Sequence, residues 1–314
     1  MPIARQPSPD SRDDDTTHDS EPNDHPAPGS TDTVDQLRRL TLPSLALAGG
    51  LAAFEIARNV VQRTHLFVPS RYPTGEWDPS LHGLAFEDVY LEGLDGVTLH
   101  GWYFPRPEAR GVMLYCHGNA GSIADRLGVF RALGQLGLDI FAFDYRGYGR
   151  STGSPTEKGL YSDAETAATY LLETRGIASR SLVILGHSLG GAVAIETARR
   201  CPAAALVVES SFTDVRDMAR YVSQHAYAGL PMHLIARNQF RSIAKVGELA
   251  LPKLFIHGTA DETVPYELGE RLYAAAAEPK SWLSVPDALH NDLHEVGGER
   301  YFGTLAAFFA RHVG

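Results

Sequence analysis

Short apolar runs that end at glycine or at a polar residue alternate with amphipathic stretches over most of the chain. Runs rich in β-branched and aromatic side chains predict strands at 85–92, 97–104, 112–116, 138–144, 181–186, 205–210, 253–258 and 281–286. A helical period predicts helices at 122–136, 157–174, 189–200, 265–277 and 298–312. Strands that alternate with crossover helices form a parallel sheet covered on both faces. We therefore expect an α/β domain over 67–314, with a mostly parallel central sheet that begins with an antiparallel hairpin.

Two N-terminal segments depart from this alternation. Residues 1–35 are rich in Pro, Asp, Ser and Thr, so they bury too little apolar surface to fold and are expected to be a disordered acidic tail. Residues 36–66 include the apolar run 40–57, which is shorter than the roughly 20 residues that span a bilayer and contains Pro43 and Glu55. We expect a helix packed on the domain there, with a weak membrane anchor as the alternative.

The net charge of −10 is concentrated in the tail, where nine acidic and two basic residues give −7 and leave −3 for residues 36–314. A nearly neutral domain has no basic stripe for a nucleic-acid backbone, so nucleic acid is not expected as a partner. Cys116 and Cys201 cannot build a disulfide framework, and the opening residues have no apolar core of a signal peptide. We expect a cytoplasmic protein, membrane-associated if 40–57 touches a bilayer.

The central motif is Gly186-His187-Ser188-Leu189-Gly190, which has the form G-x-S-x-G and lies between a predicted strand and a predicted helix. In such a nucleophile elbow the serine sits on a tight, strained turn, and small residues two positions away let the strand and the helix approach. We therefore predict Ser188 to be a nucleophile.

A serine hydroxyl needs a base to take its proton, and the base needs an orienting carboxylate. Asp261 and His290 follow later strands, in the chain order Ser, acid, His that this fold uses. We predict Asp261 as the acid and His290 as the general base.

Other residues compete for these roles. Glu209 and Asp214 follow an earlier strand and are alternatives for the acid, whereas Asp144 is expected to hold an arginine or a turn amide. Asp287 is expected to bond local amides of its loop, and His294, in a helix expected to start near Asn291, is the alternative base. The remaining histidines near strand ends, interpreted as packed and hydrogen-bonded, are His117, His187 and His257.

The developing oxyanion of an acyl transfer needs two backbone N–H donors. Leu189 N–H, at the start of the helix after the nucleophile, is one predicted donor. Asn119 N–H, in the glycine-rich loop 117–121, is the other. This loop lacks the Lys-Ser/Thr of a phosphate-binding loop and the chain shows no metal-ligand spacing, so no cofactor is expected.

HGNAG, DYRGYGRS, GHSLGG, ESSFTD, HGTADETVP and HND together resemble the small-lid α/β-hydrolases of the serine aminopeptidase-like group, and most of all the alpha/beta hydrolase domain-containing proteins. The resemblance implies the α/β-hydrolase fold over about 67–314, the same triad and oxyanion donors, and a structural role for Arg146. Two features depart from the group: Ala288-Leu289 precede His290 where a glycine is frequent, and 40–57 is a poor version of a transmembrane helix.

A short lid is predicted at about 212–245, with a pocket lined by Phe212, Met218 and Tyr221 that would suit an acyl chain or a bulky ester. The leading hypothesis is a serine esterase or thioesterase that forms an acyl-enzyme with a small-molecule or acyl-protein substrate. An aminopeptidase is the alternative, with Glu209 or Asp214 binding the free amine. A non-catalytic binding protein on the same fold is the third possibility.

Overall fold

The computed structural model describes residues 66–225 and 239–314. The predicted acidic tail 1–35 and the apolar run 40–57 lie outside these residues, as does the central part of the predicted lid. Within the two ranges, no helix combines the length and the apolar character needed to cross a membrane.

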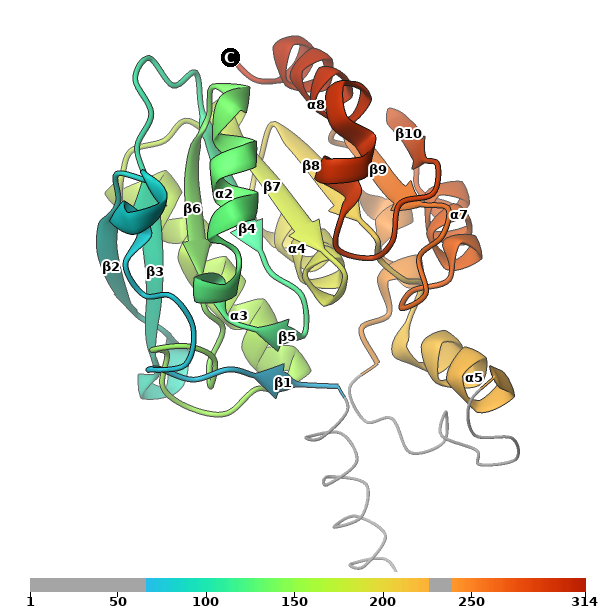
Figure 1. Ribbon diagram of the computed structural model, residues 1–314, viewed down its shortest axis with the longest axis horizontal. Helices are drawn as coiled ribbons and strands as arrows, with labels where there is room; N and C mark the ends of the chain where they lie inside the picture. Colours follow the sequence, from blue (N-terminus) through green and yellow to red (C-terminus); the bar gives the residue numbers. More distant parts are fainter. Residues whose placement is uncertain (1–65, 226–238) are drawn as a thin grey trace, which may run out of the picture. The chain divides into compact units, whose positions relative to one another are not determined.

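An eight-stranded sheet forms the centre of the domain (Figure 1). Its strands are β2 (Glu87–Glu92), β3 (Thr98–Phe104), β4 (Val112–Cys116), β6 (Asp139–Phe143), β7 (Leu182–His187), β8 (Ala205–Glu209), β9 (Lys253–Gly258) and β10 (Lys280–Val285). Their spatial order is β10-β9-β8-β7-β4-β6-β3-β2. Each strand overlaps one predicted from the sequence, and a further parallel pair joins β1 (Val68–Pro69) to β5 (Ala120–Gly121).

The direction of the strands confirms the predicted topology. β2 pairs with β3 and β3 with β6 in antiparallel fashion. The six strands β6, β4, β7, β8, β9 and β10, given in spatial order, are parallel to one another. The mostly parallel sheet with an antiparallel entry hairpin is therefore observed. Cys116 pairs with Gly186, and His187 pairs with Glu209, so the carboxyl ends of β4, β7 and β8 lie at one edge.

Helices cover both faces of the sheet (Figure 1). They are α2 (Leu127–Leu133), α3 (Glu157–Thr169), which continues as the π-helical turn η5 (Tyr170–Thr174), α4 (Leu189–Arg200), α5 (Val215–His225), α7 (Tyr266–Ala275) and α8 (Leu293–His312). Short 3₁₀ turns are η1 (Pro79–His82), η2 (Leu94–Gly96), η3 (Ile123–Asp125), η4 (Gly134–Leu136), η6 (Ser179–Ser181), η7 (Ser242–Ala244) and η8 (Val246–Glu248). Helix α8 joins the helix expected to start near Asn291 to the helical pattern predicted at 298–312, since Gly298, at φ 44°, links two helical pieces across a kink.

The apolar core has two halves, one on each face of the sheet. Neighbouring strand residues point to opposite faces, so Leu114 packs with α3 and α4 while Met113 packs with α2 and α8. Burial on both faces explains why the central strands are continuous apolar runs rather than alternating ones. The packed sheet provides a rigid base for the loops at its carboxyl edge.

Candidate active site

Ser188 lies in the sharp turn between β7 and α4, where its backbone has φ 57° and ψ −121°. Such a conformation is strained for a residue with a side chain and persists only where the surroundings enforce it. The two glycines of the motif leave no room for a larger residue. A methyl group on Gly186 would lie 2.1 Å from the Gly190 carbonyl oxygen, and one on Gly190 would lie 1.9 Å from the Cys116 carbonyl oxygen. The expected close approach of strand and helix is therefore observed.

Asp261, in the loop after β9, holds the His290 ring. Its Oδ2 accepts a hydrogen bond from His290 Nδ1 at 2.8 Å, and His257 Nε2 lies 3.3 Å from the same oxygen. Its Oδ1 accepts from the backbone N–H groups of Thr263, at 2.9 Å, and Val264, at 2.8 Å. Burial alone would raise the pKa of Asp261, but the hydrogen bonds from the two histidines lower it below its usual 3.8. The carboxylate is therefore ionised at neutral pH.

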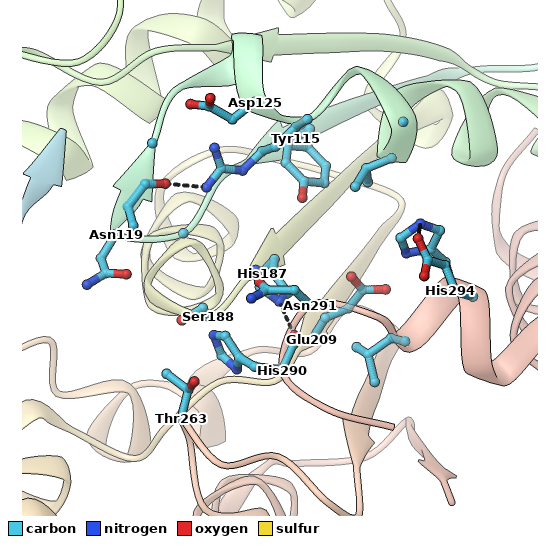
Figure 2. A pocket seen from close by; sticks show the side chains of 18 of the residues that line it. Tyr115, Asn119, Asp125, His187, Ser188, Glu209, Thr263, His290, Asn291 and His294 are labelled. Atoms are coloured by element: carbon cyan, nitrogen blue, oxygen red, sulfur yellow. Dashed lines mark hydrogen bonds and ion pairs between the residues drawn. The ribbon is translucent and has the colours of Figure 1, made fainter. Parts of the chain in front are cut away.

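Ser188 and His290 line the same cavity, and Figure 2 shows the imidazole of His290 next to Ser188. Because Nδ1 of His290 is bonded to Asp261, Nε2 is the ring atom left for the serine. Among the residues that the structure describes, none is hydrogen-bonded to Ser188 Oγ. Catalytic hydrogen bonds are often long until substrate is bound, so this geometry is compatible with a base at Nε2.

Two further histidines contact this group, although sequence reasoning assigned them only packing roles. His187 Nε2 donates to the His290 carbonyl oxygen at 2.8 Å, and the two rings lie 4.8 Å apart (Figure 2). Burial, together with the neighbouring His290, lowers the pKa of His187 to about 3, so this ring is neutral. His257 contacts Asp261 from the end of β9 and also bonds the Val264 carbonyl oxygen at 3.0 Å. The only sequence signal for these two residues was their position: His187 directly precedes Ser188, and His257 lies four residues before Asp261.

The predicted oxyanion donors lie on either side of the nucleophile. Leu189 is the first residue of α4, and Asn119 lies in the loop between β4 and β5. This loop contacts the elbow, since a methyl group on Gly118 would lie 3.4 Å from Ser188 Cβ. The oxyanion assignment stays a prediction, but the placement of both N–H groups is compatible with it.

The competing acids lie in other environments. Asp144 accepts from the Ile123 N–H at 2.9 Å, which is the expected turn amide, whereas Arg146 is held by Asp163, whose carboxylate lies 2.7 Å from its Nη2. Asp214 accepts from a backbone N–H in the first turn of α5.

The loop after β10 departs in one detail from expectation. Asp292 accepts from the Leu289 N–H at 2.7 Å, whereas the Asp287 carboxylate has no hydrogen bond to any residue in the described ranges. The carboxylate that holds this loop therefore belongs to Asp292, two residues after His290, and not to Asp287, three residues before it. His294, the alternative base, lies within α8, where its Nε2 is 3.8 Å from a Glu295 carboxylate oxygen.

The cavity beside Ser188 has a volume of about 650 Å³, and its walls are polar and apolar in nearly equal parts. Glu209 faces it and accepts from Tyr301 Oη at 2.6 Å, and burial raises the pKa of Glu209 to about 7. Arg126 also lines the cavity, and its guanidinium donates to the Ala120 carbonyl oxygen at 2.5 Å. Among the described residues, no carboxylate forms an ion pair with Arg126, and the acidic residues Asp125 and Glu295 also line the cavity.

The residues predicted to line an acyl pocket lie elsewhere on the domain. Phe212 is buried in the core, and Met218 packs against the same cluster from α5. Tyr221 is half-buried on α5. None of the three is among the residues that line the cavity at Ser188, and their role in acyl binding stays a prediction.

Comparison with known proteins places this site in context. Residues 107–245 match the family described as serine aminopeptidase, S33. An uncharacterized protein of Mycobacterium tuberculosis is 38% identical over 251 residues, which cover 79% of this chain and 86% of the relative. The alpha/beta hydrolase domain-containing protein WAV2 of Arabidopsis thaliana is 34% identical over 251 residues, covering 74% of this chain and 82% of the relative.

Solved structures give the same fold. An esterase of Pyrococcus furiosus superposes with a TM-score of 0.65 at 21% identity, over 79% of this chain and 99% of the esterase. An identity this low shows the fold alone. The chemistry of this chain must therefore be argued from its own residues.

Proposed function

The chain belongs to the α/β-hydrolase superfamily, and from this premise we propose that it is a serine hydrolase that cleaves carboxylic esters or thioesters through an acyl-enzyme. Ser188 is the proposed nucleophile, His290 the general base and Asp261 the group that orients it. The observation that carries the proposal is the hydrogen bond of 2.8 Å between His290 Nδ1 and Asp261 Oδ2, in the loops that close the cavity around the strained Ser188.

In the proposed reaction, His290 Nε2 takes the proton of Ser188 as Oγ attacks the acyl carbon. The ionised Asp261 keeps the Nδ1 proton in place and stabilises the imidazolium that forms. The N–H groups of Asn119 and Leu189 would bind the oxyanion, and the dipole of α4 favours negative charge at its first turn. His290 then passes its proton to the leaving alcohol or thiol, and water repeats the sequence to release the acid.

An aminopeptidase activity is the second candidate, because Glu209 places a buried carboxyl in the cavity where a free α-amine could bind. Arg126 lines the same cavity and its guanidinium opposes a cationic ligand, whereas the carboxylates of Asp125 and Glu295, which also line it, would attract one. Asp214, the other residue considered for this role, is not among the residues that line the cavity.

Steady-state hydrolysis by the purified full-length protein tests the proposal. The substrates would be p-nitrophenyl esters and matched thioesters of increasing acyl length, with aminoacyl p-nitroanilides as the peptidase series. We expect turnover of the esters or thioesters that is abolished in Ser188→Ala. Turnover confined to the aminoacyl anilides would favour the peptidase, and an ester rate unchanged in Ser188→Ala would contradict the proposal.

A further inference from the structure

The loop between β4 and β5 has three consecutive carbonyl groups, and each accepts a hydrogen bond from a different side chain. Tyr145 Oη donates to the carbonyl oxygen of His117 at 3.0 Å. His117 Nδ1 bonds the carbonyl oxygen of Gly118 at 2.7 Å. Tyr148 Oη donates to the carbonyl oxygen of Asn119 at 2.8 Å. No peptide plane in this part of the loop can rotate without breaking one of these bonds.

The three side chains that hold the loop form one buried cluster. The ring of His117 lies 4.2 Å from that of Tyr145 and 5.1 Å from that of Tyr148, and all three residues are fully buried. Burial lowers the pKa of His117 well below its usual 6.5, so the ring is neutral and carries one N–H. Since a carbonyl oxygen only accepts, that N–H is at Nδ1. The other nitrogen, Nε2, faces Asp144 Oδ1 at 3.5 Å.

The bond to Gly118 fixes the direction of the next N–H group. In a trans peptide the C=O of one residue and the N–H of the next point in opposite directions. Holding the Gly118 oxygen toward His117 therefore points the Asn119 N–H away from the buried cluster. Within the described part of the chain, this N–H has no hydrogen-bond partner. The same peptide begins at Gly118, where an added methyl group would lie 3.4 Å from Ser188 Cβ.

We propose that His117, together with Tyr145 and Tyr148, is a positioning residue that presets the Asn119 N–H as an oxyanion donor; the inference rests on the function proposed above. Preset donors stabilise the transition state because they need no reorganisation as charge develops. The Asn119 carbonyl oxygen also accepts from the Val68 N–H at 3.0 Å, but the peptide that carries the Asn119 N–H begins at Gly118, which constrains the backbone little. In the described part of the chain, the bond from His117 is the one hydrogen bond that this peptide makes, so without it the direction of the donor would have to be fixed during the reaction.

A pair of His117 variants separates positioning from simple packing. In His117→Asn the side-chain amide nitrogen can take the place of Nδ1 and donate to the Gly118 oxygen, whereas His117→Leu fills the space without a donor. Loss of one oxyanion donor costs about 10²–10³-fold in kcat, and a misdirected donor loses part of that, so we expect His117→Leu to lower kcat by about 10- to 100-fold. KM should change little, and His117→Asn should recover most of the rate.

A transition-state analogue supplies a readout that packing alone would not move. The affinity for a trifluoromethyl ketone, which forms an oxyanion on Ser188, should fall in His117→Leu in proportion to kcat/KM. If His117→Leu does not fold, the Tyr145→Phe/Tyr148→Phe double variant carries the test, with an expected loss of about 3- to 30-fold in kcat. Tyr103→Phe is the matched control, since this buried hydroxyl bonds Asp139 at the start of β6, at the opposite edge of the sheet.

The possible outcomes separate the inference from the proposed function. An active wild type whose folded His117→Leu variant keeps its kcat overturns the inference alone. Equal losses in His117→Leu and His117→Asn, with unchanged analogue affinity, also overturn it. A wild type that turns over no ester or thioester and binds no analogue overturns the proposed function, and the inference with it.

Discussion

Replacement of Asp261 by asparagine keeps the shape of the side chain and changes the hydrogen-bonding character of one of its two terminal atoms. Oδ1 accepts from the N–H groups of Thr263 and Val264. In the variant, the amide oxygen must take this position, because an NH2 group there would face two donors. The NH2 group then occupies the position of Oδ2 and points at His290 Nδ1. Nδ1 must become the acceptor, and the ring proton moves to Nε2, where the base is needed.

The size of the effect follows from this change of tautomer. The reverse amide orientation would leave the N–H groups of Thr263 and Val264 without their acceptor, at about 1–3 kcal/mol for the buried Val264 N–H, so the protein cannot easily restore the correct tautomer by a flip. An Asp-to-Asn exchange in a serine triad lowers kcat by about 10⁴-fold. This corresponds to about 5.5 kcal/mol of transition-state stabilisation. KM should change little, since Asp261 does not line the cavity.

The assay is steady-state hydrolysis of the best p-nitrophenyl ester by wild type and by Asp261→Asn. Asp287→Asn is the matched control: it makes the same exchange three residues before His290, at an exposed position with φ 60° that asparagine tolerates. We expect the control to keep its activity. A folded Asp261→Asn variant whose kcat is within about tenfold of wild type would refute the reasoning and return Glu209 as the candidate acid.

Two substitutions test the stability of the site. Gly190→Ala places a methyl group 1.9 Å from the Cys116 carbonyl oxygen, so we expect it to lower the free energy of unfolding, measured by denaturant titration, by about 3 kcal/mol or more. Gly303→Ala is the control: it lies in α8 with nothing within 4 Å of the added methyl group and should leave the free energy of unfolding unchanged or slightly higher. A Gly190→Ala protein as stable as wild type would contradict the elbow geometry. Burial raises the pKa of Glu209 from 4.5 to about 7. Between these two pH values the folded protein keeps a proton that the unfolded chain has lost. The free energy of unfolding therefore falls as pH rises through this interval, because the carboxyl becomes ionised while it is buried. Glu209→Gln, which can still accept from Tyr301, should therefore stabilise the protein by up to about 3 kcal/mol near pH 8 and little near pH 4; an equal effect at both pH values would contradict this.

The strands could be predicted from the sequence because burial on both faces requires continuous apolar runs. The predicted and observed bounds of 112–116, 253–258 and 205–210 agree to within one residue. The two-residue strands β1 and β5 could not be found in this way, because two residues carry no periodicity. The two pieces of α8, one expected near Asn291 and one at 298–312, were not predicted to join, since Gly298 interrupts the helical pattern.

The candidate site could be predicted where its residues lie next to a strand end and not where they depend on tertiary contacts. Ser188 was located by local turn chemistry, and the structure places Asp261 against His290 as the chain order suggested. The hydrogen bond between Glu209 and Tyr301 joins residues 92 positions apart, and no local sequence pattern predicts it. The role of His257 beside Asp261 likewise depends on how the loop after β9 folds back on its own strand.

Labelling with a fluorophosphonate probe, followed by mass spectrometry of the modified peptide, tests the central claim most directly, because the probe reacts only with a serine that a base has activated. The account predicts a single covalent adduct on Ser188, formed at neutral pH, lost in Ser188→Ala and strongly slowed in His290→Ala. Absence of labelling in the folded wild type, or an adduct that persists in Ser188→Ala, would contradict it.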